Sequence, residues 1–165
     1  MTPSWLEILR LLAMLGCGLM AGIFFAFSNF VMRAFARICP SQGIAAMQAV
    51  NITVLNPLFM LAFMGTAALC IADIALALVF GSGNTVYLIA GGALYLLGNI
   101  GVTAVFNVPM NDALAAVDAG QPDTVHIGKH YLDKWTFWNH VRTITALAAA
   151  AAFTLALVGS PAASS

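Results

Sequence analysis

Polar side chains recur at helical spacing in the second half of this otherwise apolar sequence. Asn99, Thr103 and Asn107 follow one another at intervals of four residues. Residues at this spacing lie on one face of an α-helix. A second run, WTFWNHVRT at 135–143, places two tryptophans, an amide and a guanidinium along one stripe. We expect the two stripes to face a shared interior in a helical bundle.

The second stripe offers a group for acid–base chemistry beside amide and guanidinium groups. Histidine exchanges protons near neutral pH, so His140 is the candidate general base. Arg142 lies nearly two turns inside an apolar helix, and an arginine surrounded by amides is expected to face the bundle interior.

Further amides flank the apolar segments of the chain at positions that a four-helix arrangement brings to the same end. The complete set of candidate binding residues is Asn29, Asn51, Asn56, Asn99, Thr103, Asn107, Asn111, Trp135 and Trp138. Polar groups inside a membrane are costly and often mark function. They also join helices through interhelical hydrogen bonds. The cluster thus indicates either a ligand pocket or a set of structural contacts.

The composition determines the kind of element that positions these groups. The chain has 165 residues, of which 62% are hydrophobic and 7% are charged, and its mean hydropathy is +0.96. Soluble domains carry about a quarter charged residues, so a soluble surface is not indicated. Four apolar segments, at about 5–31, 57–80, 86–108 and 136–158, each exceed the ~20 residues that span a bilayer. The prediction is a single all-α membrane domain over 1–165, folded as a four-helix transmembrane bundle.

Two longer connections, 32–56 and 109–135, lie on one side of the membrane if there are four spans. The lysines and arginines on that side are Arg33, Arg37, Lys129 and Lys134, whereas the terminal side carries Arg10. Because cytoplasmic segments are enriched in Lys and Arg, we expect the connections in the cytoplasm and both termini outside, in a bacterial inner membrane. The net charge of zero gives no indication of a nucleic-acid partner.

Small residues and one carboxylate stand out elsewhere in the spans. Gly18 and Gly22, followed by Ala26, form a small-residue ridge that predicts close helix packing, either within the bundle or in a homo-oligomer or larger membrane complex. Asp73 lies deep in the second segment, toward the terminal side, and Arg10 could pair with it. A proton or ion relay is the alternative.

The histidines and cysteines favour no metal site. His126 and His130 have the i, i+4 spacing of two ligands on one helical face, but a solvated pair is the preferred interpretation. Cys17, Cys39 and Cys70 are far apart and odd in number, and no metal is predicted.

Several strings resemble the anthrone oxygenase family, also designated DUF1772. These are FFAFSNFVM on the first segment, NITVLNP at 51–57, NVPMN at 107–111 and WTFWNHVRT at 135–143. The resemblance implies a small four-helix membrane protein, related to oxidases of anthrones in polyketide pathways. It also implies a lipophilic aromatic substrate, anthrone- or quinol-like, with O₂ as co-substrate.

An anthrone loses a proton to give an electron-rich anthrolate that reacts directly with O₂, so no cofactor is predicted. In this interpretation Trp135 and Trp138 stack on the substrate, and Asn51, Asn107 and Asn111 hold its ring hydroxyls. His140 is the base, and Asn139 and Arg142 bind the oxyanion. The alternative is a non-catalytic membrane binding or carrier protein, or an accessory subunit with a structural amide cluster.

Overall fold

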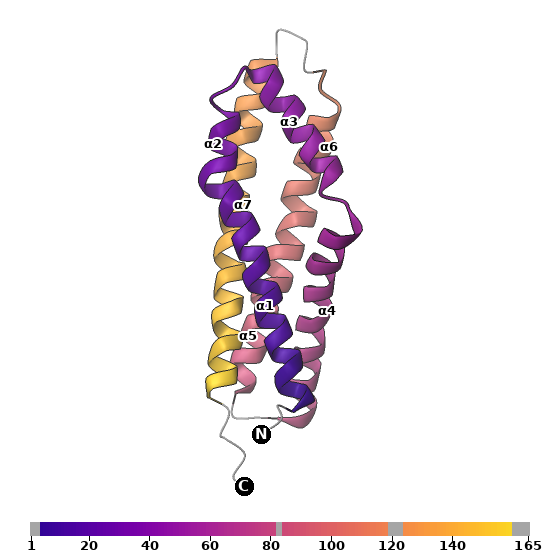
Figure 1. Cartoon of the computed structure of the whole chain (residues 1–165), viewed down its shortest axis with the longest axis vertical. Helices are drawn as coiled ribbons and strands as arrows, with labels where there is room; N and C mark the ends of the chain where they lie inside the picture. The colour runs from indigo at the N-terminus through magenta and orange to yellow at the C-terminus, as the bar shows by residue number, and fades with distance from the viewer. Residues whose placement is uncertain (1–3, 82–83, 119–123, 160–165) are drawn as a thin grey trace.

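The computed structural model describes residues 4–81, 84–118 and 124–159. All secondary structure in this part of the chain is helical, and four helical stretches are long and apolar enough to cross a membrane: Trp5–Phe35, Pro57–Phe80, Thr85–Ala115 and His126–Val158. They stand side by side as one upright bundle, with both termini at the lower end (Figure 1). The predicted all-α bundle of four membrane helices is confirmed.

The first two membrane helices begin at recognisable capping residues. Ser4 and Glu7 form a capping box at the start of α1 (Trp5–Ala26). Asn56 caps α4 (Pro57–Phe80), in which Pro57 occupies the first turn. The α4 helix ends at Gly81, whose φ of 58° favours glycine. Ser82, Gly83 and the tail 160–165 lie outside the described residues.

The four helices form a ring in chain order. The first span contacts α4 and α7 (Thr124–Val158), and α5 (Thr85–Tyr95) contacts the same two helices from the opposite side. Apolar side chains such as Met20, Phe63 and Phe153 fill the centre. The outer surface carries large exposed hydrophobic residues, as a lipid-facing surface requires.

Three π-helical segments interrupt the first and third spans. They are η1 (Phe27–Val31), η2 (Leu96–Gly101) and η3 (Thr103–Asn107). In η3 the Val108 N–H bonds to the Thr103 carbonyl, five residues earlier. Such wide turns occur mostly as single-turn bulges inside α-helices, frequently at functional sites.

The first, third and fourth spans extend beyond their predicted ends, and much of each predicted connection is helical. The first span continues through α2 (Met32–Phe35), and the third continues through α6 (Val108–Ala115). The span does not end at Pro109: this residue directly follows the wide turn of η3, and the helix continues as α6. The fourth helix begins at Thr124 rather than near 136.

The connection 32–56 contains a separate helix, α3 (Pro40–Thr53). It runs obliquely across the upper end of the bundle, between α2 and α6 (Figure 1). The Gln48 amide nitrogen donates to the carbonyls of Leu114 and Val117, both at 2.9 Å. These bonds attach α3 to the end of α6.

The glycine ridge of the first span does not pack inside the bundle. Gly18 and Gly22 are exposed, and a Cβ built on either would meet nothing within 4 Å. Close packing occurs instead at Gly16, which lies against Thr66, and at Gly98, which lies against Thr145. The ridge therefore lies on the outer surface.

Candidate functional site

A cavity of about 640 Å³ opens between the upper half of the bundle and α3. Its walls come from the first span, α3, the start of α4, η3 with α6, and α7. Ligand pockets in proteins have volumes of about 300–1,000 Å³ and mostly apolar walls. Most of the lining is apolar, and its polar members are Gln48, Asn51, Thr103, Asn107, Asn111, Asp112, Trp135 and Arg142.

Arg142 is the buried cation of this cavity, with only 5% of its surface exposed. Its guanidinium carbon lies 4.3 Å from the centre of the Phe24 ring and 5.0 Å from that of Trp135. The Nη1 group donates to Thr103 Oγ1 at 3.2 Å, and Nη2 donates to Asn139 Oδ1 at 2.7 Å. No carboxylate among the described residues pairs with it, and Nε has no hydrogen-bond partner there.

A buried charge without a counter-ion is unusual, because desolvation costs several kcal/mol per ion. Two aromatic faces and two neutral acceptors offset part of this cost. The remaining donor and the uncompensated charge make this wall of the cavity suited to an anionic oxygen.

Asn139 holds the Arg142 guanidinium in position through hydrogen bonds. Its side-chain nitrogen donates to the Phe24 carbonyl and to Ser28 Oγ, both at 2.7 Å, while its oxygen accepts from Arg142. Both amide hydrogens are thus used. Ser28 belongs to η1, so the π turn of the first span receives the α7 amide. Asn139 does not line the cavity and is a positioning residue in this geometry.

Three buried polar atoms of the cavity-lining residues lack a partner among the described residues. They are Arg142 Nε, Asn51 Nδ2 and Asn107 Oδ1. Asn107 is 1% exposed, and its nitrogen makes only a long contact of 3.5 Å to the Trp135 carbonyl. Buried polar groups in proteins are nearly always paired. These unpaired donors and this acceptor are available for hydrogen bonds to a polar group in the cavity.

Asn111 is held in place by aromatic side chains of α7. Its oxygen accepts from the Tyr131 hydroxyl at 2.8 Å and from Trp135 Nε1 at 2.9 Å. The contacts agree with the prediction that the two stripes face each other. Thr103 of the first stripe accepts from Arg142 of the second, and Asn99 donates to Thr145 of α7 at 3.2 Å.

Five further predicted residues lie outside the cavity. Asn29 is exposed, and Asn56 is an exposed helix cap that binds Phe59 N and the Thr53 carbonyl. Asn99 is buried against α7. Trp138 stacks on Phe106 with ring centres 3.5 Å apart, and His140 is exposed. The structure brings together Asn51, Thr103, Asn107, Asn111, Trp135 and Arg142.

Several lining or supporting residues were missed from the sequence. Phe24 and Met47 are apolar residues in apolar surroundings and carry no signal of their own. Gln48 is three residues before Asn51 and so shares its face of α3, and Asp112 directly follows Asn111. Tyr131 precedes Trp135 by one helical turn, and the length of the stripe could have revealed it.

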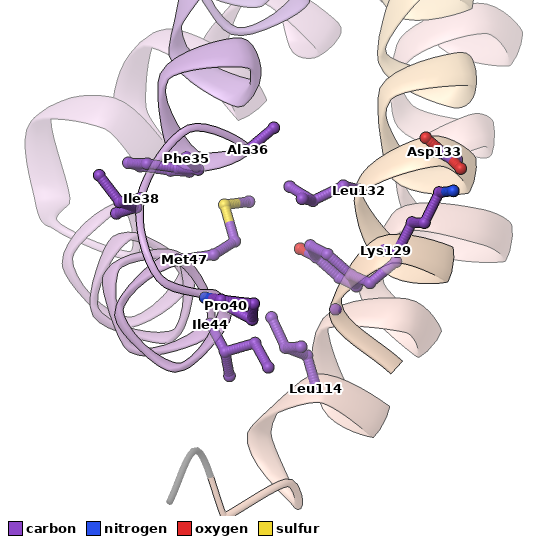
Figure 2. A pocket seen from close by; sticks show the side chains of 13 residues that line it. Phe35, Ala36, Ile38, Pro40, Ile44, Met47, Leu114, Lys129, Leu132 and Asp133 are labelled. Atoms are coloured by element: carbon purple, nitrogen blue, oxygen red, sulfur yellow. The ribbon is translucent and has the colours of Figure 1, made fainter. Parts of the chain in front are cut away.

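A second cavity of about 320 Å³ lies farther toward the upper end, between α3 and the first turns of α7 (Figure 2). Phe35, Ile38, Ile44, Met47, Leu114 and Leu132 give it an apolar lining. Lys129 and Asp133 stand on its α7 side.

The remaining polar candidates lie elsewhere. His126 and His130 are exposed on α7, and no group of three or more metal-ligand side chains occurs in the described part of the chain. Asp73 is 1% exposed, and its Oδ2 makes no hydrogen bond to any described group; the same holds for Arg10 Nε. Neither Asp73 nor Arg10 lines the cavity.

A family model described as anthrone oxygenase matches residues 59–152, which is more than half of the chain. The match includes α4, the third span and most of α7, and thus Thr103, Asn107 and Arg142. Neither functionally curated proteins nor solved structures gave a significant match. With four apolar helices and this match, the chain belongs to the anthrone oxygenase (DUF1772) family of integral membrane proteins.

Proposed function

We propose that this protein binds a flat, lipophilic aromatic compound and oxidises it with O₂. The observation that carries the proposal is Arg142, a buried cation without a carboxylate partner among the described residues, which lines a mostly apolar cavity. Its position between the Phe24 and Trp135 rings suits an aromatic oxyanion. Asn51 and Asn107 add an unpaired donor and acceptor for ring substituents.

The proposed reaction converts the methylene group of an anthrone to a carbonyl. A base removes one methylene proton, and the enolate oxygen so formed is held by Arg142. The carbanion-like carbon gives an electron to O₂, and the two combine to form a C–O bond and a hydroperoxide. Loss of the second C–H proton and cleavage of the O–O bond then give the quinone and one water. Because the enolate supplies all the electrons, the scheme requires no cofactor.

The proton acceptor in this scheme is Asp112. It is the one carboxylate among the described lining residues, and no histidine is among them. His140, the base expected from the sequence, lies on the exposed side of α7. At about 100° per residue, it is roughly 140° around the helix from Trp135. A proton from a ligand in the cavity would reach His140 only through intervening groups.

Turnover in lipid nanodiscs tests the proposal. The substrate is 1,8-dihydroxyanthrone, and the readouts are O₂ uptake and quinone absorbance, with protein-free nanodiscs giving the spontaneous rate. Arg142→Gln is expected to lower kcat/KM at least 100-fold, the effect of removing one oxyanion donor. The matched control is Arg37→Gln, at an exposed arginine outside the cavity, which keeps the wild-type rate. Equal rates for the two variants would refute the proposal.

The second candidate is a binding or carrier protein with no catalytic step. It is favoured by the amides that are fully used in helix contacts, such as Asn139. Tight binding of 1,8-dihydroxyanthraquinone that depends on Arg142, without any quinone formation from the anthrone, would select this function.

We propose further that the α3 end of the bundle faces the cytoplasm of a bacterial cell. Cys39 is the exposed cysteine among the three, and Cys17 and Cys70 are buried. A membrane-impermeant maleimide is therefore expected to label the protein in inside-out vesicles and not in intact spheroplasts. Labelling in spheroplasts would reverse the orientation.

The exposed Gly18 and Gly22 ridge is the proposed contact for a homo-oligomer or a larger membrane complex. Leucine at both positions is expected to abolish crosslinked dimers without changing turnover. Unchanged crosslinking would exclude this surface.

A further inference from the structure

The two cavities of the upper bundle meet at one side chain, Met47. This residue of α3 lines both of them and is only 1% exposed. The cavities are stacked along the same three helices. On α7, Gly128 and Leu132 border the smaller cavity and Trp135 and Arg142 the larger; on α3, Ile44 borders the smaller and Asn51 the larger.

The two cavities share an apolar boundary at Met47. The larger cavity carries Arg142, Asn51 and Asn107, with their unpaired polar atoms. Near Met47 the surroundings become apolar, and Met32, Ile44 and Leu114 pack in the same cluster. The smaller cavity continues this apolar lining with Phe35 and Leu132, and its charged side chains, Lys129 and Asp133, stand on the α7 side (Figure 2).

Methionine suits a movable partition. Its side chain is unbranched, with a flexible thioether that adapts to neighbouring shapes. In Figure 2 the Met47 side chain points from α3 into the smaller cavity, between Phe35 and Leu132. Shortening this one side chain would join the two spaces without removing a polar group.

We propose that the smaller cavity is a second binding chamber, which receives an apolar substituent of the ligand whose oxyanion lies at Arg142, and that Met47 sets the length of substituent accepted. This proposal rests on the proposed function, since it needs a ligand in the larger cavity. The chemical class is an aromatic phenol or enol with an alkyl chain pointing away from its ionised oxygen.

The experiment measures dissociation constants for 1,8-dihydroxyanthraquinones that carry hydrogen, methyl, butyl or octyl at ring position 3. Tryptophan fluorescence in nanodiscs is the readout, and the octyl-to-hydrogen affinity ratio is compared between variants, so that partitioning into lipid cancels. In Met47→Ala this ratio is expected to rise at least tenfold, because each buried methylene contributes about fourfold in affinity. The matched control is Met60→Ala, in which a methionine of the larger cavity alone is shortened, and its ratio stays at the wild-type value.

A third variant closes the chamber from its far side. A Cβ at Gly128 would lie 3.3 Å from Ile44 Cδ1, so Gly128→Leu places its side chain in the smaller cavity. Added to Met47→Ala, it is expected to remove the gain for the octyl compound and leave binding of the unsubstituted compound unchanged. Should Met47→Ala not fold, Met47→Val carries the same expectation, with a gain of at least threefold.

The outcomes separate this inference from the function on which it rests. If the unsubstituted compound needs Arg142 but the octyl-to-hydrogen ratio is the same in wild type, Met47→Ala and Met60→Ala, the second chamber is refuted and the function stands. If the unsubstituted compound binds wild type and Arg142→Gln equally, the proposed function itself fails.

Discussion

Asn139 is the residue whose removal tests the architecture of the site most severely. Replacing it with alanine breaks two hydrogen bonds from α7 to the first span, to the Phe24 carbonyl and Ser28 Oγ, and one from Arg142. Interhelical hydrogen bonds between neutral groups in membranes contribute about 1 kcal/mol each, and a bond to a charged group about 1.5–3 kcal/mol. The expected loss of unfolding free energy is therefore about 4 kcal/mol.

Two assays separate the structural and ligand-binding consequences of Asn139→Ala. Equilibrium unfolding in mixed micelles of dodecyl maltoside and increasing SDS gives the change in stability. The affinity for 1,8-dihydroxyanthraquinone is expected to fall at least tenfold, because Arg142 loses the acceptor that fixes its Nη2 group. Asn29→Ala, at an exposed amide of the first span, is the control, with a change within about 0.5 kcal/mol.

The reasoning is refuted if Asn139→Ala loses less than about 1 kcal/mol, a value below that of one charged hydrogen bond. It is also refuted if stability falls as expected while affinity is unchanged, since Arg142 would then not depend on Asn139 for its position.

Two further predictions concern the proton acceptor and the α3 helix. Asp112→Asn is expected to lower kcat by about 100-fold or more, as for loss of a general base, with little change in the dissociation constant of the anthraquinone. His140→Asn is expected to retain the wild-type kcat. A loss of kcat in His140→Asn and not in Asp112→Asn would identify His140 as the base. Gln48→Ala removes both hydrogen bonds to the Leu114 and Val117 carbonyls. This variant is expected to lower the free energy of unfolding by about 1–2 kcal/mol and to speed ligand dissociation in stopped-flow measurements. An unchanged dissociation rate would show that α3 does not retain the ligand.

Hydropathy predicted the four spans well because a helix that crosses lipid must be apolar along its whole length. The bounds of the second span, 57–80, agree with α4 because Asn56 and Pro57 mark its start and Gly81 its end. The other three helices continue past the apolar segments into stretches with polar residues such as Arg33 and His126. Average hydropathy carries no information about helices outside lipid, and therefore those ends were predicted too short.

The inward stripe on α7 was predicted only in part. Trp135, Asn139 and Arg142 follow the 3.6-residue period and face the bundle, whereas Trp138 lies at the edge of this face and reaches Phe106 instead. The π segments were not predicted, since no residue pattern in the sequence specifies a wide turn. The contact of Ser28 with Asn139 depends on the fold of η1 and on long-range packing.

The wall of the cavity formed by α3 also required the structure. Asn51 was identified as a polar residue beside an apolar segment, but the role of the helix around it arises from tertiary contacts with α6 and α7. The place of Met47 between the two cavities likewise appears only in the structure, because residue type alone does not indicate it.

Ionisation of a bound hydroxyanthraquinone tests the central claim most directly, because deprotonation of this chromophore shifts its visible absorbance. The claim is that Arg142, buried without a carboxylate partner among the described residues, stabilises an aromatic oxyanion in the larger cavity. In wild type, the bound 1,8-dihydroxyanthraquinone is expected to ionise at a pH at least about one unit lower than in Arg142→Gln, equivalent to about 1.4 kcal/mol of anion stabilisation. An identical ionisation midpoint in the two proteins, with the ligand bound to both, would contradict it.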